Sequence, residues 1–399
     1  MLRIALKMLA GDRGKYAGLL FGIAFTSFLI TFAASFFCGF MTRGFSLISD
    51  NPAADVWVMD PAVESVDQTT NIPASALDRV RSVTGVGSAT PLALAVAEAR
   101  FPNGRFQSFQ LIGVDDATLA GVPLLRGDLP VKLSLRGPDA VLIDSGGSVG
   151  KLETPRFERD QWPHGEPHLA TPTRPLAARD ELLVNDHRVV VAGYAHALPR
   201  FPPRPLMYTT LANAVRILPP ERHRLTFVLA SAVPGVEPAE LARGIEAQTG
   251  LRARTAADFK EDTVRWNLVN SEDVGDVGAM LTLAMTVGFG MTAVLLYIFT
   301  TESLKQYAVL KAMGATSGML LAMIFVQAGV CALIGTGLGL GMCGIAGPIV
   351  AAQGFPFRMM WFTPVMGGVM VLVVCALAAM ISARPVLKLE PAAVFAGRV

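Results

Sequence analysis

The segment KQYAVLKAMGAT, residues 305–316, is short and basic and lies between two long uncharged stretches. Residues 277–301 carry no charged side chain, and neither do residues 312–357. A basic connection between two such stretches is expected at a membrane surface, and the inside preference of Lys and Arg places it on the cytoplasmic side. The segment is therefore predicted to be the part of a membrane protein that faces the cytosol.

The composition is also that of a membrane protein. The mean hydropathy is +0.46. Hydrophobic residues make up 52% of the chain and charged residues only 17%, whereas about a quarter of the residues in soluble domains are charged. About 20 apolar residues are needed to cross the hydrocarbon layer as a helix. Four stretches meet this length, namely residues 17–42, 277–301, 317–347 and 363–383.

The distribution of Lys and Arg predicts the orientation of these spans. Residues 1–16, 302–316 and 384–399 each contain two or more basic side chains, whereas residues 348–362 contain a single Arg. Basic residues in short segments remain on the cytoplasmic side. Both termini and the 302–316 segment are therefore expected inside, with residues 43–276 and the 348–362 loop outside.

The beginning of the chain could be mistaken for a cleaved secretory signal, because basic residues precede an apolar stretch. The apolar stretch of residues 17–42 is longer than the apolar part of a signal peptide, however, and no small-x-small cleavage site follows it. An uncleaved anchor is the favoured interpretation. Residues 1–16 alternate apolar and basic positions and are expected to form an amphipathic helix in the inner headgroup layer.

The outer segment, residues 43–276, is predicted to be a large α+β domain. Two β-α-β patterns are present at its two ends, with strand, helix and strand at residues 54–59, 73–83 and 86–99 and again at 225–231, 238–248 and 251–255. These two units would frame a β-rich insert of about residues 101–223, with strand patterns at 107–114, 140–143 and 188–193. Residues 256–276 are expected to form a helical stalk.

The four cysteines are Cys38, Cys331, Cys343 and Cys375, and all lie within or beside the predicted spans. The outer domain therefore has no disulfide framework, and its fold is expected to depend on an ordinary apolar core.

Two glycine-rich motifs were tested as ligand sites. Residues 147–151 (GSVGK) resemble part of a phosphate-binding loop but lack its first Gly and the Ser or Thr after Lys, so a surface turn is favoured. Residues 339–344 (GLGMCG) have dinucleotide-binding spacing but lie in an apolar span, so helix packing is favoured there. The glycines expected to pack are Gly335, Gly337, Gly339 and Gly341.

No catalytic or metal site is predicted. The five histidines all lie in the outer domain, and His164 and His168 are separated by Gly165 and Pro167, so no helix places them on one face. The spans contain no ionisable side chain of the kind that forms a proton relay.

The 302–316 segment has the pattern of a short amphipathic helix. Leu304, Tyr307 and Leu310 recur every three residues, and Gly314 is suited to a left-handed helix cap. Two interpretations remain open. From these residues alone a purely structural turn is favoured over a lever that transmits force between the spans.

A family resemblance changes this balance. Residues 311–316 (KAMGAT) followed by a glycine-rich span, and residues 389–394 (LEPAAV), resemble the MacB/FtsX/LolC superfamily of ABC transporter permeases (type VII), and the chain is most similar to DevC-like members. The resemblance covers nearly the whole chain. Many members have Arg-Glu-Ile-Gly where this sequence has residues 305–308 (KQYA), and an Arg pair where this sequence has Arg384-Pro385.

The resemblance implies a non-catalytic permease subunit in a bacterial inner membrane. A cytosolic ABC ATPase would bind ATP and Mg and dock on a coupling helix, while this chain would bind no cofactor and no nucleic acid. The coupling residues would be Leu304, Lys305, Gln306, Tyr307, Val309, Leu310, Lys311, Met313 and Gly314. Leu310→Asp is expected to impair ATPase recruitment.

The resemblance also implies partners and a function. Two copies would pair among membrane lipids, and a periplasmic adaptor (membrane-fusion) protein with a TolC-like outer-membrane duct would complete an exporter of a lipid, glycolipid, peptide or small hydrophobic compound. Two alternatives remain: a regulator that uses the same mechanotransmission to control an outer partner such as a cell-wall hydrolase, and a lipoprotein-release subunit.

Overall fold

The computed structural model describes residues 13–123, 129–146, 150–156, 172–200, 204–219 and 225–387. The chain divides into a membrane unit, Met1–Phe40 with Ser271–Val399, and an outer unit, Met41–Asn270. Several predictions lie outside the described residues: most of the N-terminal amphipathic helix, most of the GSVGK motif, the histidine pair at 164 and 168, and the LEPAAV motif.

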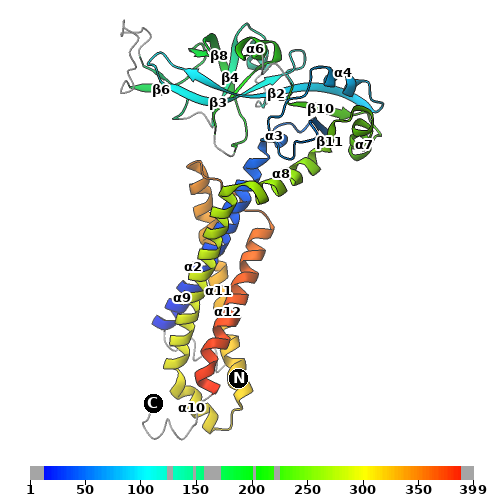
Figure 1. Ribbon diagram of the computed structural model, residues 1–399. Helices are drawn as coiled ribbons and strands as arrows, with labels where there is room; N and C mark the ends of the chain where they lie inside the picture. The colour runs from blue at the N-terminus through cyan, green and yellow to red at the C-terminus, as the bar shows by residue number, and fades with distance from the viewer. Residues whose placement is uncertain are drawn as a thin grey trace. The chain divides into compact units, whose positions relative to one another are not determined.

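The membrane unit contains four helices that are long and apolar enough to span a membrane among the described residues. They are α2 (Arg13–Gly44), α9 (Glu272–Glu302), α11 (Ser317–Ala352) and α12 (Phe362–Leu387), and they lie side by side (Figure 1). The short helix α10 (Leu304–Ala312) connects α9 to α11.

The third and fourth spans extend further than the sequence indicated. A connection was expected to begin at Pro348, but α11 continues through this proline to Ala352, and α12 likewise continues through Pro385. A proline removes its own N–H from the helix and its ring crowds the preceding turn, but a membrane helix tolerates it where neighbouring helices satisfy the freed backbone groups. At the other end, α9 begins at Glu272, so residues expected in the stalk belong to the spanning helix.

Helix α2 is the central helix of the membrane unit. Its most apolar window is 61% buried, compared with 17% for α9. Hydroxyl side chains of α2 contact each of the other three spans, because small residues allow the backbones to approach. The contacts are Thr26 Oγ1 to Gly288 O (3.1 Å) in α9, Ser27 Oγ to Thr336 O (3.4 Å) in α11, and Ser35 Oγ to Thr363 Oγ1 (3.5 Å) in α12.

The outer unit is built on a nine-stranded mixed sheet in the order β11-β1-β10-β2-β3-β9-β4-β8-β7. Its first half combines two β-α-β units, which confirms the predicted fold class. One unit is β1 (Val56–Met59), α4 (Ser75–Arg81) and β2 (Val86–Arg100), and the other is β10 (Phe227–Ala232), α7 (Pro238–Thr249) and β11 (Arg252–Thr255). Strand β10 lies between β1 and β2 and is antiparallel to both, so the two units interlock.

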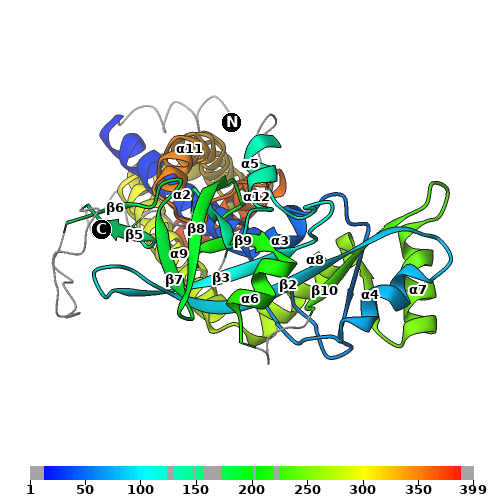
Figure 2. The same cartoon turned by 90° about the horizontal axis from the view of Figure 1, so that it is seen from above.

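The insert extends the same sheet beyond β2 (Figure 2). Strand β3 (Phe106–Val114) pairs with β2 and, in parallel, with β9 (Leu206–Thr210). The remaining elements of the insert are α5 (Leu129–Ser134), β4 (Ala140–Asp144), β5 (Glu153–Pro155), β6 (Thr173–Pro175), β7 (Glu181–Val184), β8 (His187–Ala195) and α6 (Leu211–Ile217). Strands β5 and β6 form a separate small sheet.

An aromatic cluster attaches the helix at the end of the outer unit to the sheet. The ring of Trp57 in β1 lies 5.3 Å from that of Phe227 in β10 and 5.8 Å from that of Phe259 in α8 (Ala256–Asn270). All three side chains are fully buried. Large aromatic side chains bury much apolar surface, so this cluster fixes α8 to β1 and β10. The short helix α3 (Ser46–Ser49) also contributes Leu47 and Ile48 to this core.

Candidate functional site

Helix α10 is set off from both neighbouring spans by breaks in the helical backbone. Ser303 separates it from α9, and the helix ends before Gly314, which has a φ of +97°. This left-handed conformation favours glycine, and it gives the helix the cap that the sequence predicts. The next helix, α11, is capped by the preceding Thr316, whose side chain accepts a hydrogen bond from Met319 N. Non-helical residues at both ends therefore separate α10 from the two neighbouring spans.

One face of α10 packs against the spans. Tyr307 and Ala308 are fully buried, and the Tyr307 hydroxyl donates a hydrogen bond of 2.9 Å to Gln327 Oε1 in α11. Leu304 and Leu310 are half-buried against the same apolar cluster. The apolar spacing in the sequence therefore belongs to the face that holds α10 on the membrane unit. Leu310, expected to be a docking contact, is half-buried in this face, and its role in docking stays a prediction.

The other face of α10 and its C-terminal end are exposed. Lys305 and Gln306 are exposed, Val309 is 46% exposed and Met313 is 72% exposed. Lys311 is half-buried. A valine and a methionine flanked by a cation and an amide form a small mixed surface that a protein partner can contact, and methionine adapts well to such surfaces.

The glycines of α11 differ in what surrounds them. A Cβ added at Gly335 would lie 2.6 Å from Ile23 Cγ2, and one added at Gly339 would lie 2.6 Å from Ser27 Cβ and collide with the Ala24 carbonyl oxygen. These two glycines therefore allow α2 to approach closely. No described atom lies within 4 Å of an added Cβ at Gly337 or Gly341. The structure thus brings two of the four predicted glycines against another helix.

Further packing glycines, among them Gly288 and Gly367, were not singled out from the sequence. An added Cβ at Gly288 in α9 would lie 2.6 Å from Thr26 Cγ2, and one at Gly367 in α12 would collide with Thr31 Oγ1. The spacing of Thr26 and Thr31 along α2 was the available signal, since small and hydroxyl side chains are common at contacts between membrane helices.

A buried ion pair in the outer unit was also missed. The side chains of Asp50 and Arg200 are 4% and 8% exposed, with Oδ2 and Nη2 3.9 Å apart. Asp50 Oδ1 accepts a hydrogen bond from Leu198 N, and Arg200 donates to Gln110 Oε1 at 2.9 Å. Burial raises the pKa of the Asp50 carboxyl to about 6, because the cost of desolvation exceeds the stabilisation from Leu198 and Arg200. These residues lie far apart in the sequence, so no local pattern connects them.

Among the described residues, four helices long enough and apolar enough to span a membrane, with a short exposed helix between the second and third, are the arrangement of a multi-pass membrane protein. Residues 278–391, which contain most of α9 and all of α10, α11 and α12, match the FtsX-like permease C-terminal family. Residues 278–391 therefore form an FtsX-like permease domain, which bears out the predicted resemblance to MacB/FtsX-type ABC permeases. Closer similarity to DevC-like members stays a prediction.

Solved structures with a similar fold include the periplasmic region of MacB from Actinobacillus actinomycetemcomitans, with 11% identity, a TM-score of 0.35, and coverage of 55% of this chain and 94% of that one. Another is the extracellular domain of the ABC-type transporter YknZ from Gram-positive bacteria, with 12% identity, a TM-score of 0.30, and coverage of 51% and 98%. No curated protein matches the sequence.

Proposed function

We propose that this chain is the non-catalytic permease subunit of an exporter in a bacterial inner membrane, with its termini in the cytoplasm. A separate cytosolic ATPase, which binds ATP and Mg, docks on α10. The observation that carries the proposal is the position of α10: its buried Tyr307 fixes it to α11, while Val309 and Met313 remain exposed. The family implies an ATPase partner, and α10 offers it a firmly held contact.

A movement of α10 has a continuous route along the chain to the outer unit. Only Ser303 separates α10 from α9, and only Ser271 separates α9 from α8. Helix α9 is the least buried of the four spans, with 17% of its most apolar window buried. Helix α8 is attached to β1 through Phe259 and Trp57. Closure of the ATPase on ATP would therefore be passed through α9 and α8 to the sheet.

The cargo that fits this arrangement is a lipid, glycolipid, peptide or small hydrophobic compound taken from the outer leaflet or periplasm. Two copies of the chain pair in the membrane, and a periplasmic adaptor and a TolC-like outer-membrane duct complete the export path. The same motion would serve a regulator of an outer partner such as a cell-wall hydrolase, or a lipoprotein-release subunit. The partners distinguish these three functions.

Docking on α10 is tested by substituting its exposed apolar side chains. Val309→Asp and Met313→Asp place a charge on the outward surface, and each is expected to reduce co-purification of the ATPase from the native host. Val215→Asp, at a 38% exposed site in the outer unit, is the matched control. If both α10 variants recover the ATPase as well as the control does, α10 is not the docking site.

The export function is tested by the proteins that accompany the tagged chain in gentle detergent, identified by mass spectrometry. An ATPase together with a periplasmic adaptor supports the exporter. An ATPase with a hydrolase and no adaptor supports the regulator.

A further inference from the structure

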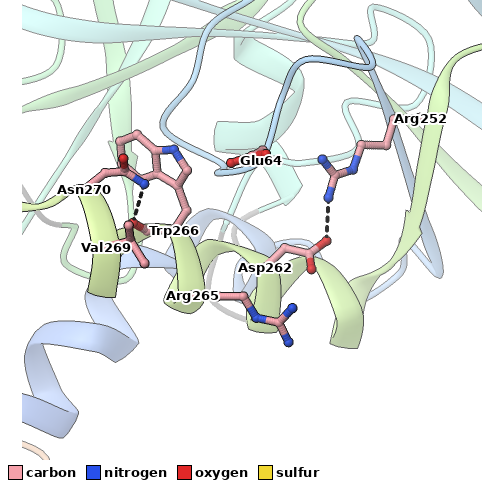
Figure 3. Close-up of a pocket in the computed structure, with 7 residues that line it drawn as sticks. All are labelled: Glu64, Arg252, Asp262, Arg265, Trp266, Val269 and Asn270. Carbon is pink, nitrogen blue, oxygen red and sulfur yellow. Dashed lines mark hydrogen bonds and ion pairs between the residues drawn. The ribbon is translucent and has the colours of Figure 1, made fainter.

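A small open cavity lies in the outer unit beside the last turns of α8 (Figure 3). Its volume is about 270 Å³, and it is lined by Glu64, Arg252, Asp262, Arg265, Trp266, Val269 and Asn270. Sites for drug-sized ligands measure roughly 300–1,000 Å³. The cavity is therefore suited to a small polar group.

The charges on the cavity wall balance. Two arginines and two acidic residues line it, so their formal charges sum to zero. Arg252 and Asp262 are committed to one another at 2.9 Å, and Arg252 also donates to Val63 O at 2.8 Å. Glu64 and Arg265 remain as one exposed anion and one exposed cation. A pair of opposite charges is complementary to a zwitterion. A ligand that carries only a negative charge would be repelled by Glu64 and would offer it no cation to bind.

Arg265 can exchange its present partner. It donates to Glu261 at 3.0 Å, with the two side chains 72% and 71% exposed. Ion pairs as exposed as this one contribute little stability. A phosphate arriving in the cavity can therefore take the place of the Glu261 carboxylate.

Trp266 supplies an aromatic surface for a cation. Its indole is half-buried, and Figure 3 shows it on the same side of α8 as Glu64. A carboxylate beside an aromatic face attracts an ammonium group through charge and cation–π interactions. The cavity thus offers an ammonium subsite at Glu64 and Trp266, and Arg265, which Figure 3 draws leaving α8 on the side away from Glu64, would supply a phosphate subsite on turning from Glu261 into the cavity.

The apolar edge of the cavity indicates a lipid as the source of this headgroup. Val269 is 79% exposed and Leu268 is 48% exposed at the end of a helix that is otherwise largely polar. Only Ser271 separates α8 from α9, which is long and apolar enough to span a membrane. The end of α8 is thus joined through one residue to a helix suited to the membrane, and tryptophan side chains are enriched beside such helices at the headgroup layer.

We propose that this cavity binds the headgroup of a zwitterionic phospholipid that carries a primary ammonium, of the phosphoethanolamine type. Glu64 and Trp266 hold the ammonium, Arg265 holds the phosphate, and Val269 contacts the glycerol and upper acyl region. The inference concerns binding alone, so it holds whether or not the lipid is transported and whichever partner docks on α10.

Native mass spectrometry of the full chain tests this site. The delipidated protein in detergent is mixed with equal amounts of dioleoyl phosphatidylethanolamine and dioleoyl phosphatidylglycerol. We expect the wild-type chain to retain the ethanolamine lipid preferentially. Glu64→Gln and Trp266→Leu are each expected to weaken that binding about fivefold, and Arg265→Gln is expected to weaken the binding of both lipids.

Glu240→Gln, at an exposed carboxylate on α7, is the matched control and should bind like the wild type. Thermal unfolding of each variant separates a folding defect from lost binding. Equal retention of the two lipids by the wild-type chain overturns the proposal, and so does unchanged ethanolamine-lipid binding in Glu64→Gln. Co-purification of the ATPase is measured on the same variants, so failure here is distinguishable from failure of the docking proposal.

Discussion

Gly339 and Gly337 of α11 provide a matched pair of substitutions that test the packing of the membrane unit. In Gly339→Ala the new methyl group would lie 2.6 Å from Ser27 Cβ and collide with the carbonyl oxygen of Ala24. Ordinary contact begins at 3.4 Å, so α2 would have to retreat by about 0.8 Å. Neither neighbouring atom can rotate away, because one belongs to the backbone and the other is a Cβ. Gly337→Ala meets no described atom within 4 Å.

The magnitude follows from two opposing effects. Overpacking costs about 1–3 kcal/mol, whereas replacing Gly by Ala inside a helix gains up to about 1 kcal/mol. The free energy of unfolding is therefore expected to fall by about 1–2 kcal/mol in Gly339→Ala. In Gly337→Ala only the favourable effect operates, so stability is expected to remain equal or rise slightly.

Thermal unfolding of the full chain in detergent, followed by circular dichroism, measures the difference. One kcal/mol corresponds to about 2–4 °C in the midpoint for a unit of this size. We expect the midpoint of Gly339→Ala to fall by about 2–8 °C and that of Gly337→Ala to stay within about 2 °C of the wild type or rise. Equal midpoints, or a larger fall for Gly337→Ala, would refute the close approach of α2 at Gly339.

Three further predictions concern α10 and the buried carboxyl group of the outer unit. Tyr307→Phe removes the hydroxyl that donates to Gln327. This loss should lower the free energy of unfolding by about 1–2 kcal/mol and reduce stimulation of the ATPase. Adding Gln327→Leu should restore part of the stability, and no recovery would mean that the two side chains are not coupled. Leu310→Asp places a charge against the spans and should lower both the thermal midpoint and ATPase recovery, whereas Val309→Asp should lower recovery alone; equal thermal losses would contradict the assignment of faces. Asp50 has a pKa raised to about 6 by burial, so the folded state holds this proton more tightly than the unfolded state. Its stabilisation is complete below the unfolded pKa of about 4 and declines as the pH rises through about 6. Denaturant unfolding at several pH values should show a flatter decline in Asp50→Asn, and an unchanged slope would rule out this group as the cause.

The two β-α-β units could be predicted from the sequence because each is a local pattern. Strand-forming residues mark β1, and the proline at the start of α7 marks a helix that is capped by Gly250. The order of the strands in the insert could not be predicted. Strands β3 and β9 pair in parallel although most of the insert separates them in the chain, and such pairing leaves no periodic signal along the sequence.

The candidate site shows a similar limit. The spacing of Tyr307 and Leu310 predicted an apolar face on α10, but spacing alone cannot say whether the spans or a partner cover that face. The hydrogen-bond partner of Tyr307, Gln327, belongs to another helix, so no spacing within α10 indicates it. Gly337 and Gly339 have equivalent spacing partners in the sequence, and only the position of α2 distinguishes them.

The contacts of α2 have a consequence for biogenesis. The central helix of the membrane unit precedes α9, α11 and α12 in the chain, so it leaves the ribosome before the three helices that later cover it. Thr26 can bond to the carbonyl oxygen of Gly22 in its own helix at 2.8 Å, which shields its hydroxyl from hydrocarbon during that interval. When α9 arrives, the same hydroxyl gains Gly288 and Thr292 as neighbours. Helix α2 can thus lie in the bilayer with the Thr26 hydroxyl already hydrogen-bonded before the helices that pack against it are inserted.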